Sequence, residues 1–266
     1  MRTQRRGPGR RWARWIIGGV AVLVVLLVGG PFVYIHFIEG KAPAPLSLST
    51  ATTAAGTGAP TSTAAPGPSS SAPSSSAPSS SGLAAAGATG AGSTVDGTWK
   101  VAAGSVAGYR IKETLFGQSN TAVGRTSSVT GSITISGAEV RTGTFSVDMT
   151  TVKSDESQRD HQFQGRIMDT SQFPTATFAL TKPITLGSVP ADGVVVTEPA
   201  TGNLTLHGTT RPVTFTVQAK RSGSTIGVSG SVPIVFADYG IDNPSGGPAQ
   251  TSDNGTLEFL LNFTQG

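Results

Sequence analysis

The chain has 266 residues, of which 35 are Gly, 17 are Pro and none is Cys. The lack of cysteine excludes a disulfide scaffold, a thiolate zinc site, a cysteine nucleophile and a cysteine-linked lipid anchor. The formal net charge of +4 comes from six Arg within the first 14 residues, whereas residues 96–266 carry 12 Lys and Arg against 14 Asp and Glu. Because nucleic-acid binding needs a basic surface on the folded domain itself, this distribution argues against a nucleic-acid partner.

A run of 24 residues without a formally charged side chain, residues 15–38, follows the basic tail at residues 1–14. At about 1.5 Å per residue, a helix of this length crosses a hydrocarbon core of about 30 Å. The Arg residues before it predict a cytoplasmic N-terminus and an extracytoplasmic remainder. A cleaved signal peptide is the alternative, although its apolar region usually has only about 7–15 residues. The pattern therefore favours an uncleaved anchor in the cytoplasmic membrane, crossed once.

Residues 39–95 are rich in Ala, Ser, Pro, Thr and Gly. After Lys41 no charged residue occurs until Asp96, and three Ser triplets are separated by Ala-Pro pairs. Such a stretch has too little bulky apolar surface to offset chain entropy, so a disordered linker is predicted. As a flexible coil it would span about 40 Å. The composition is compatible with glycosylation of its Ser and Thr residues.

Residues 96–266 are predicted to form one all-β domain, because apolar and polar residues alternate there with a period of two. In residues 213–220 the odd positions hold Val, Phe, Val and Ala, and the even positions hold Thr, Thr, Gln and Lys. The same alternation recurs along residues 257–263. It is typical of antiparallel strands with one apolar face. A sandwich and a closed barrel both satisfy this pattern.

One stretch, residues 154–169, breaks the alternation and predicts a short helix between two strands. It starts with Ser154, a residue type that caps helices, and continues with two acidic residues. Phe163 and Ile167 stand four positions apart and define an apolar side. Gly165 weakens the helix interior by about 1 kcal/mol.

The hairpin at residues 202–215, GNLTLHGTTRPVTF, closely resembles the GDLTIHGVTRPV hairpin of the YceI-like family of polyisoprenoid-binding proteins. Weaker similarities occur at Arg159-Asp160, at residues 168–178 (MDTSQFPTATF) and at residues 236–241 (FADYGI). The resemblance extends over essentially all of residues 97–265. It implies a lipocalin-like, extended antiparallel β-barrel of about eight strands with one short helix. It also implies a pore that holds a long isoprenoid chain or a similar amphiphile, without catalytic activity.

The predicted helix supplies the candidates for the barrel mouth and for a ligand head group: Arg159, Asp160, His161 and Phe163. The family pattern Arg-Asp-x-His-Leu is altered here, because His161 is shifted by one position and Gln162 stands where the family usually has His. An Arg fork suits a diphosphate or quinone head group. The alternative is that Arg159 and Asp160 form structural ion pairs that attach the helix to the barrel.

Apolar residues of one strand parity are predicted to point into the barrel. They are Phe145, Val147, Phe178, Leu180, Phe215, Val217, Val232, Ile234 and Phe236. They form either a filled core or the lining of a lipid-binding pore. Gly230, Ala176 and Ala219 share their parities and leave room for a chain. The pore is favoured mainly because the resemblance to the YceI-like family implies one.

No G-x-S-x-G nucleophile elbow and no phosphate-binding Gly-rich loop occurs in the sequence. His161 and His207 are the only His residues outside the anchor region, so no metal site is expected and no enzyme is predicted. The leading hypothesis is a membrane-tethered extracytoplasmic protein that holds a polyisoprenoid, an isoprenoid quinone or a similar lipid, with no other cofactor. The alternative is an extracellular interaction or envelope-stress module with a filled core and no fixed ligand.

Overall fold

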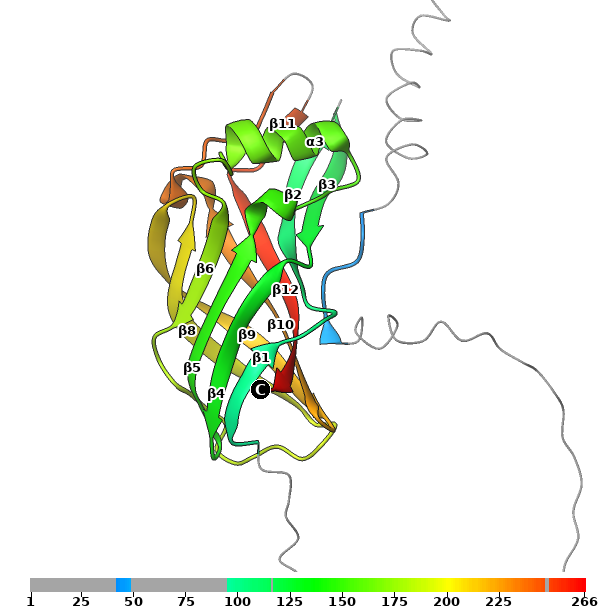
Figure 1. Cartoon of the computed structure of the whole chain (residues 1–266). Coiled ribbons are helices and arrows are strands. Elements are labelled where there is room, and N and C mark those ends of the chain that lie inside the picture. Colours follow the sequence, from blue (N-terminus) through cyan, green and yellow to red (C-terminus); the bar gives the residue numbers. More distant parts are fainter. Residues whose placement is uncertain (1–41, 49–94, 116, 247–248) are drawn as a thin grey trace, which may run out of the picture.

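The computed structural model describes residues 42–48, 95–115, 117–246 and 249–266 (Figure 1). The predicted anchor at residues 15–38 and most of the predicted linker at residues 39–95 lie outside these ranges. Within the described ranges, no helix is both long enough and apolar enough to span a bilayer.

The strands close into a barrel, which decides between the two architectures that the alternation left open. Eight strands form a circuit in the order β1, β4, β5, β6, β8, β9, β10 and β12, and β1 pairs with β12 to complete it. All of these pairings are antiparallel. The strands of the circuit are β1 (Gly97–Val101), β4 (Val129–Ser136), β5 (Glu139–Asp148), β6 (Thr175–Leu180), β8 (Val195–Leu206), β9 (Thr209–Ser222), β10 (Thr225–Val235) and β12 (Asn254–Gln265).

Four further strands extend this circuit. β2 (Val106–Leu115) pairs with residues 256–260 of β12, directly beyond the stretch of β12 that pairs with β1. β3 (Gln118–Thr126) forms a hairpin with β2, and β11 (Ala249–Thr251) pairs with the far end of β2. The short β7 (Ile184–Thr185) pairs with β5. Strand β12 therefore contacts three neighbours, namely β1, β2 and β10.

The two ends of the barrel differ. One end, called the helix end here, carries α3 (Ser157–Gln162), η3 (Phe163–Ile167) and η4 (Phe236–Tyr239), while η2 (Met149–Thr151) follows β5 (Figure 1). The other end, called the loop end, carries the β4–β5 and β9–β10 hairpins and the connection from β7 to β8 (Figure 1).

The predicted helix is present but begins later than its sequence suggested. Its first turn is capped by Glu156, whose side chain accepts a hydrogen bond from the backbone N–H of Gln158. The expectation that Ser154 caps the helix is therefore wrong. Ser154 instead donates through its backbone N–H and its hydroxyl to Asp160, at 2.7 and 2.8 Å. After Gln162 the helix widens into a π-helical turn that contains Gly165.

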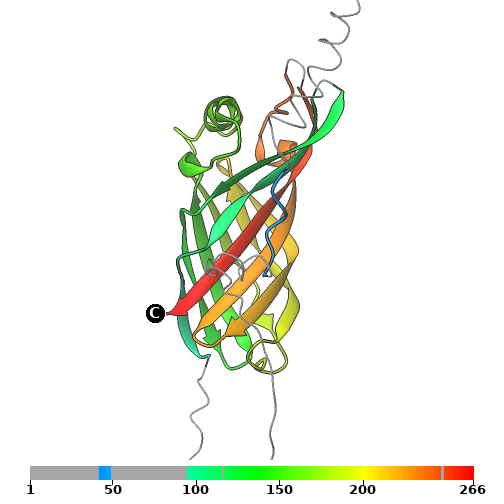
Figure 2. The same ribbon diagram turned by 90° about the vertical axis from the view of Figure 1, so that its right-hand side faces the viewer.

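Residues 42–48 do not follow the prediction of a disordered linker. They lie along the outer surface of the barrel over β12 and β10, as Figure 2 shows in blue. The backbone of this segment makes hydrogen bonds with three barrel side chains. The rest of the predicted linker up to residue 94 lies outside the described residues.

Candidate functional site

A cavity of about 290 Å³ lies inside the barrel, between the inward faces of its strands. Its wall takes residues from both apolar clusters of the interior, one at the helix end and one at the loop end. All nine residues that the sequence placed inside line this cavity: Phe145, Val147, Phe178, Leu180, Phe215, Val217, Val232, Ile234 and Phe236. The interior is therefore not a filled core.

Glycines on the strands keep the bore open. Gly230 on β10 pairs with Phe259 on β12, and an ideal Cβ at Gly230 would lie 2.6 Å from Phe259 Cζ. Gly202 on β8 pairs with Leu180 of β6, and an ideal Cβ at Gly202 would lie 2.3 Å from Cζ of Phe178, two residues away on that strand. The Phe178 and Phe259 rings thus lie over the backbone of a glycine, and each also packs edge-on against Phe215, with 5.3 and 5.9 Å between ring centroids.

The wall of the cavity is almost entirely aliphatic or aromatic. A large cavity with such a lining holds water poorly, because water needs two to four polar partners. The same space can hold an apolar molecule, since burial of its surface is favourable by about 25 cal/mol per Å². The chemistry of the site is therefore that of binding a hydrocarbon chain.

Four charged residues line the cavity, Glu198, Lys220, Arg221 and Glu258, and of these Glu198 and Arg221 have the inward strand parity, near the loop end. Glu198 on β8 has the parity of Val196 and Ala200, and Arg221 on β9 has the parity of Phe215; both line the cavity. Arg221 Nε also lies 3.6 Å from Oδ1 of Asp192. The alternation itself contained this signal, because each charge stands in register with a series of apolar residues. These two residues give the cavity a polar region.

The loop end is also the more open end. Val189 and Val194, both on the connection from β7 to β8, line the cavity and are 47% and 48% exposed. At the helix end, by contrast, the lining residues Phe163, Met168 and Phe236 are at most 7% exposed. The expectation that the helix forms the mouth thus differs from the structure, in which buried side chains close that end.

Phe163 is the one mouth candidate that reaches the cavity. Its ring stacks on Tyr109, with 5.0 Å between centroids. Burial raises the pKa of Tyr109 well above its ordinary value, so its hydroxyl stays neutral at physiological pH. The pair forms the apolar floor of the cavity at the helix end.

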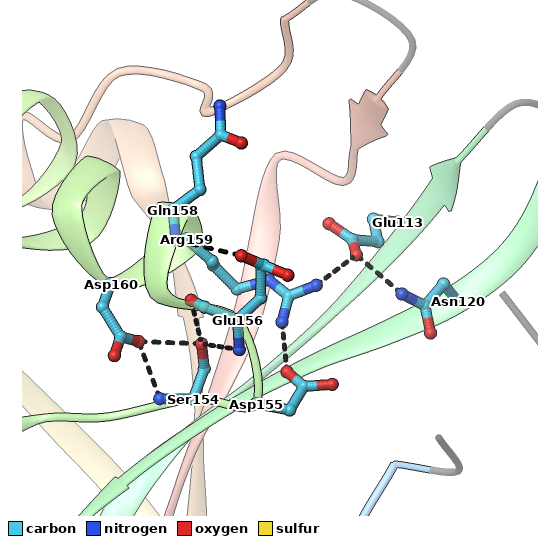
Figure 3. A network of polar contacts seen from close by, with 8 residues as sticks. All are labelled: Glu113, Asn120, Ser154, Asp155, Glu156, Gln158, Arg159 and Asp160. Carbon is cyan, nitrogen blue, oxygen red and sulfur yellow. Dashed lines mark hydrogen bonds and ion pairs between the residues drawn. The ribbon is translucent and has the colours of Figure 1, made fainter. Parts of the chain in front are cut away.

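Arg159 and Asp160 are occupied by partners within the protein (Figure 3). The Arg159 guanidinium lies 3.3 Å from Glu113 on β2 and also pairs with Asp155, one helical turn away. Asp160 is 7% exposed and accepts both hydrogen bonds from Ser154. This geometry agrees with structural ion pairs that attach α3 to β2. His161 is exposed on the helix surface and does not line the cavity.

The hairpin that carries the family resemblance is attached to the helix end. His207 adopts a φ of 50°, its Nδ1 lies 3.2 Å from the backbone oxygen of Tyr239, and its ring packs edge-on against Phe173. Arg211 donates through Nε to the backbone oxygen of Asp238 at 2.9 Å. Both residues thus hold the β8–β9 turn against η4. Within the described residues, no cluster of three acidic or His side chains could hold a metal ion.

Comparison with known proteins identifies the same domain. The family model of the YceI-like domain matches residues 92–263. A UPF0312 protein of Pseudomonas putida is 31% identical over 132 residues, which are 46% of this chain and 65% of that protein. A UPF0312 protein of Vibrio parahaemolyticus is 31% identical over 102 residues, 36% of this chain and 50% of that protein. The chain thus spans about half to two thirds of the length of these relatives.

A solved structure shares the fold. It is a polyisoprenoid-binding domain from Saccharophagus degradans implicated in plant cell wall breakdown. The similarity has a TM-score of 0.52 at 16% sequence identity and covers 64% of this chain and 98% of that domain.

Proposed function

The chain belongs to the YceI-like domain family, and on this premise we propose that its barrel binds a long apolar lipid of the isoprenoid class. The observation that carries the proposal is the apolar cavity of about 290 Å³, lined by all nine predicted residues. Such a cavity argues against the alternative of an interaction or envelope-stress module with a filled core. The described polyisoprenoid-binding function of the Saccharophagus domain supports an isoprenoid chain.

The lipid is proposed to enter tail first from the loop end. Its hydrocarbon chain then extends toward the floor formed by Phe163 and Tyr109, and its polar end remains near Glu198 and Arg221. The closed helix end and the internal ion pairs of Arg159 support this direction. No bond is made or broken in this scheme, so the role is binding and not catalysis.

We further propose that the predicted anchor at residues 15–38 holds this activity at a membrane. In this proposal the protein is a single-pass cytoplasmic-membrane protein whose barrel is extracytoplasmic. The apolar length of the anchor and the Arg-rich tail before it support that arrangement.

Native mass spectrometry of residues 42–266, secreted and purified without detergent, tests the binding proposal. We expect a bound mass of several hundred daltons that organic solvent extracts and whose fragments show an isoprenoid chain. A ligand-free protein that also takes up neither added isoprenoid quinone nor prenyl phosphate would overturn it.

A further inference from the structure

A buried carboxylate lies on the outer surface of the barrel. Glu258 on β12 has the outward strand parity, opposite to that of Leu257 and Phe259, which pack against the interior cluster, yet it is only 4% exposed. Two guanidinium groups neutralise it. Arg125 Nη2 lies 2.7 Å from Oε1, and Arg110 Nε lies 3.4 Å from Oε2.

The strand register explains how these charges meet. Gly108 on β2 pairs with Glu258 on one side and with Arg125 of β3 on the other. The Arg125 side chain crosses the position of Gly108, where an ideal Cβ would lie only 2.9 Å from Arg125 Cγ. The glycine thus opens a path over β2 that brings the guanidinium to Glu258.

The same three side chains hold residues 42–48, called the strap here. Arg110 Nη2 donates to the backbone oxygen of Pro43 at 2.6 Å, and Arg125 Nη2 donates to that of Ala44 at 2.5 Å. Glu258 Oε2 accepts from the backbone N–H of Leu46 at 3.3 Å. Because all three contacts use strap backbone atoms, this site recognises an extended peptide.

Apolar contact and burial extend the strap site along β12 and β10. Leu48 Cδ2 lies 3.1 Å from the position that a Cβ of Gly227 would occupy. Ser229 and Leu260 pair across β10 and β12 at outward positions, and they are 3% and 5% exposed. Leu260 belongs to neither interior cluster, so its burial reflects cover on the outside of the barrel.

We propose that the strap is a built-in clamp that determines where the N-terminal part of the chain leaves the barrel and how the barrel faces the membrane. The direction of the strap determines which end of the barrel faces the membrane. This part of the proposal depends on the membrane anchor of the proposed function. Pro43 contacts Arg110, which pairs with Thr256 near the start of β12. Leu48 contacts Gly227, which pairs with Asn262 farther along β12. The strap therefore enters from the side of the helix end (Figure 2).

The reach of the connection limits the possible orientations. Residues 39–41 join the predicted anchor to the strap. The four Cα–Cα steps from residue 38 to residue 42 span at most about 14 Å. Strand β12 continues for nine residues beyond Thr256 toward the loop end, which is about 30 Å. The clamp therefore holds the helix end toward the membrane and the lipid-entry end away from it. In this proposal the length of residues 49–94 does not set the height of the barrel above the membrane.

Cysteine crosslinking of the full chain tests the clamp, because the protein has no native cysteine. The pair Leu48→Cys with Gly227→Cys probes the docked strap, and Leu48→Cys with Ala179→Cys on β6, across the barrel, is the control. A protease site is inserted within residues 49–94. After cleavage, the two fragments of a crosslinked protein stay joined, whereas those of an uncrosslinked protein separate. We expect at least a five-fold faster crosslink for the first pair.

Leu46→Pro removes the N–H that binds Glu258 together with the leucine side chain and fixes the local φ, and Leu46→Ala, which removes the side chain but keeps the N–H, is its matched control. We expect the proline variant, but not the alanine variant, to slow the first crosslink at least five-fold. Equal rates for the two cysteine pairs, or no response to Leu46→Pro, would overturn the clamp. The readout needs no bound lipid and no membrane, so it is independent of the proposed function.

Energy transfer to a labelled lipid tests the orientation in vesicles of phosphatidylethanolamine and phosphatidylglycerol. Donor dyes are placed at Gln158→Cys at the helix end or at Ser224→Cys at the loop end. We expect stronger transfer from Gln158, unchanged by shortening residues 49–94 and lost with Leu46→Pro. Equal transfer from both sites would overturn the orientation. Failure of the chain to insert would overturn the anchor and the orientation together, while the crosslink still decides the clamp.

Discussion

Single side chains of one strand parity decide whether the interior of this barrel accepts a hydrocarbon chain. Val217 lines the cavity and is half-buried, whereas its neighbour Gln218 is exposed on the outside. A carboxylate at an inward position would need a partner or water, and neither suits an apolar bore. The two positions therefore form a matched pair for mutation.

We expect Val217→Asp to reduce retained lipid at least ten-fold, while Gln218→Asp leaves it unchanged. Phe215→Asp is expected to act in the same way, but it places the charge deeper and costs more stability. Lipid extracted per mole of folded protein is the measurement, with circular dichroism as the control for folding. Full retention in a folded Val217→Asp variant would show that the lipid lies elsewhere.

A substitution of Arg159 distinguishes a structural role of this residue from contact with a lipid head group. The Arg159 side chain is 16% exposed, and its guanidinium is paired with Glu113 and Asp155. Loss of these charged hydrogen bonds should lower the free energy of unfolding by about 1–3 kcal/mol. We therefore expect Arg159→Gln to lose stability in urea but to retain lipid. Arg166→Gln, at an exposed residue of η3, is the control. Normal stability with lost lipid would instead assign Arg159 to the head group.

Tyr109 makes the stability of the barrel sensitive to alkaline pH. Burial raises its pKa in the folded protein above the unfolded value of about 10. Between these two values the unfolded chain loses the proton and the folded chain keeps it, so stability falls as the pH rises. The loss is up to about 1.4 kcal/mol per pH unit above pH 10. Urea unfolding at pH 8 and pH 11 should show a smaller loss for Tyr109→Phe than for the unmodified protein.

At the scale of the elements, the alternation was enough to predict the strands and the nine lining residues. It could not decide closure, because the β1–β12 pairing joins segments about 160 residues apart and leaves no local signal. The inward positions of Glu198 and Arg221 could be read from the same alternation, because both share the parity of apolar neighbours, but no charged lining residue was predicted. The strap was assigned to the disordered linker on its composition. Its binding uses backbone atoms and distant Arg and Glu side chains, which composition does not report.

A substitution at Gly230 tests whether the pairing of this glycine with an aromatic ring on the next strand keeps the bore open. Gly230→Leu would displace the Phe259 ring, which lies 2.6 Å from the position of the new Cβ. We expect the ring or the new side chain to enter the bore and to lower bound lipid several-fold. Ser231→Leu, at an exposed outward position of the same strand, is the control. Equal lipid content in the two variants would show that the rings do not limit the bore.

At the scale of the whole molecule, the cavity couples stability to occupancy. A ligand that binds only the folded barrel adds about 2.7 kcal/mol when its concentration is 100 times its Kd. For a domain of this size, each kcal/mol raises Tm by about 2–4 °C. We expect delipidated protein to melt about 5–10 °C below protein that is reloaded with an isoprenoid quinone, and Val217→Asp to remove this difference. An unchanged Tm on reloading would contradict binding inside the barrel.

Strand β12 contacts β1, β2 and β10, and it is also the last of the twelve strands to be synthesised. Until residues 254–265 emerge, the other strands of the circuit can pair only as an open sheet with two unpaired edges and an exposed apolar face, and the β2–β3 hairpin lacks the strand that joins it to them. Such an intermediate invites aggregation, and a hydrophobic molecule can reach its concave side without passing through the later mouth. The pairing of β12 with β1 and β10 therefore ends the period of biogenesis in which the interior is open from the side. Under the proposed function, lipid present during this window would be enclosed laterally, and lipid that arrives afterwards would have to enter between the loops.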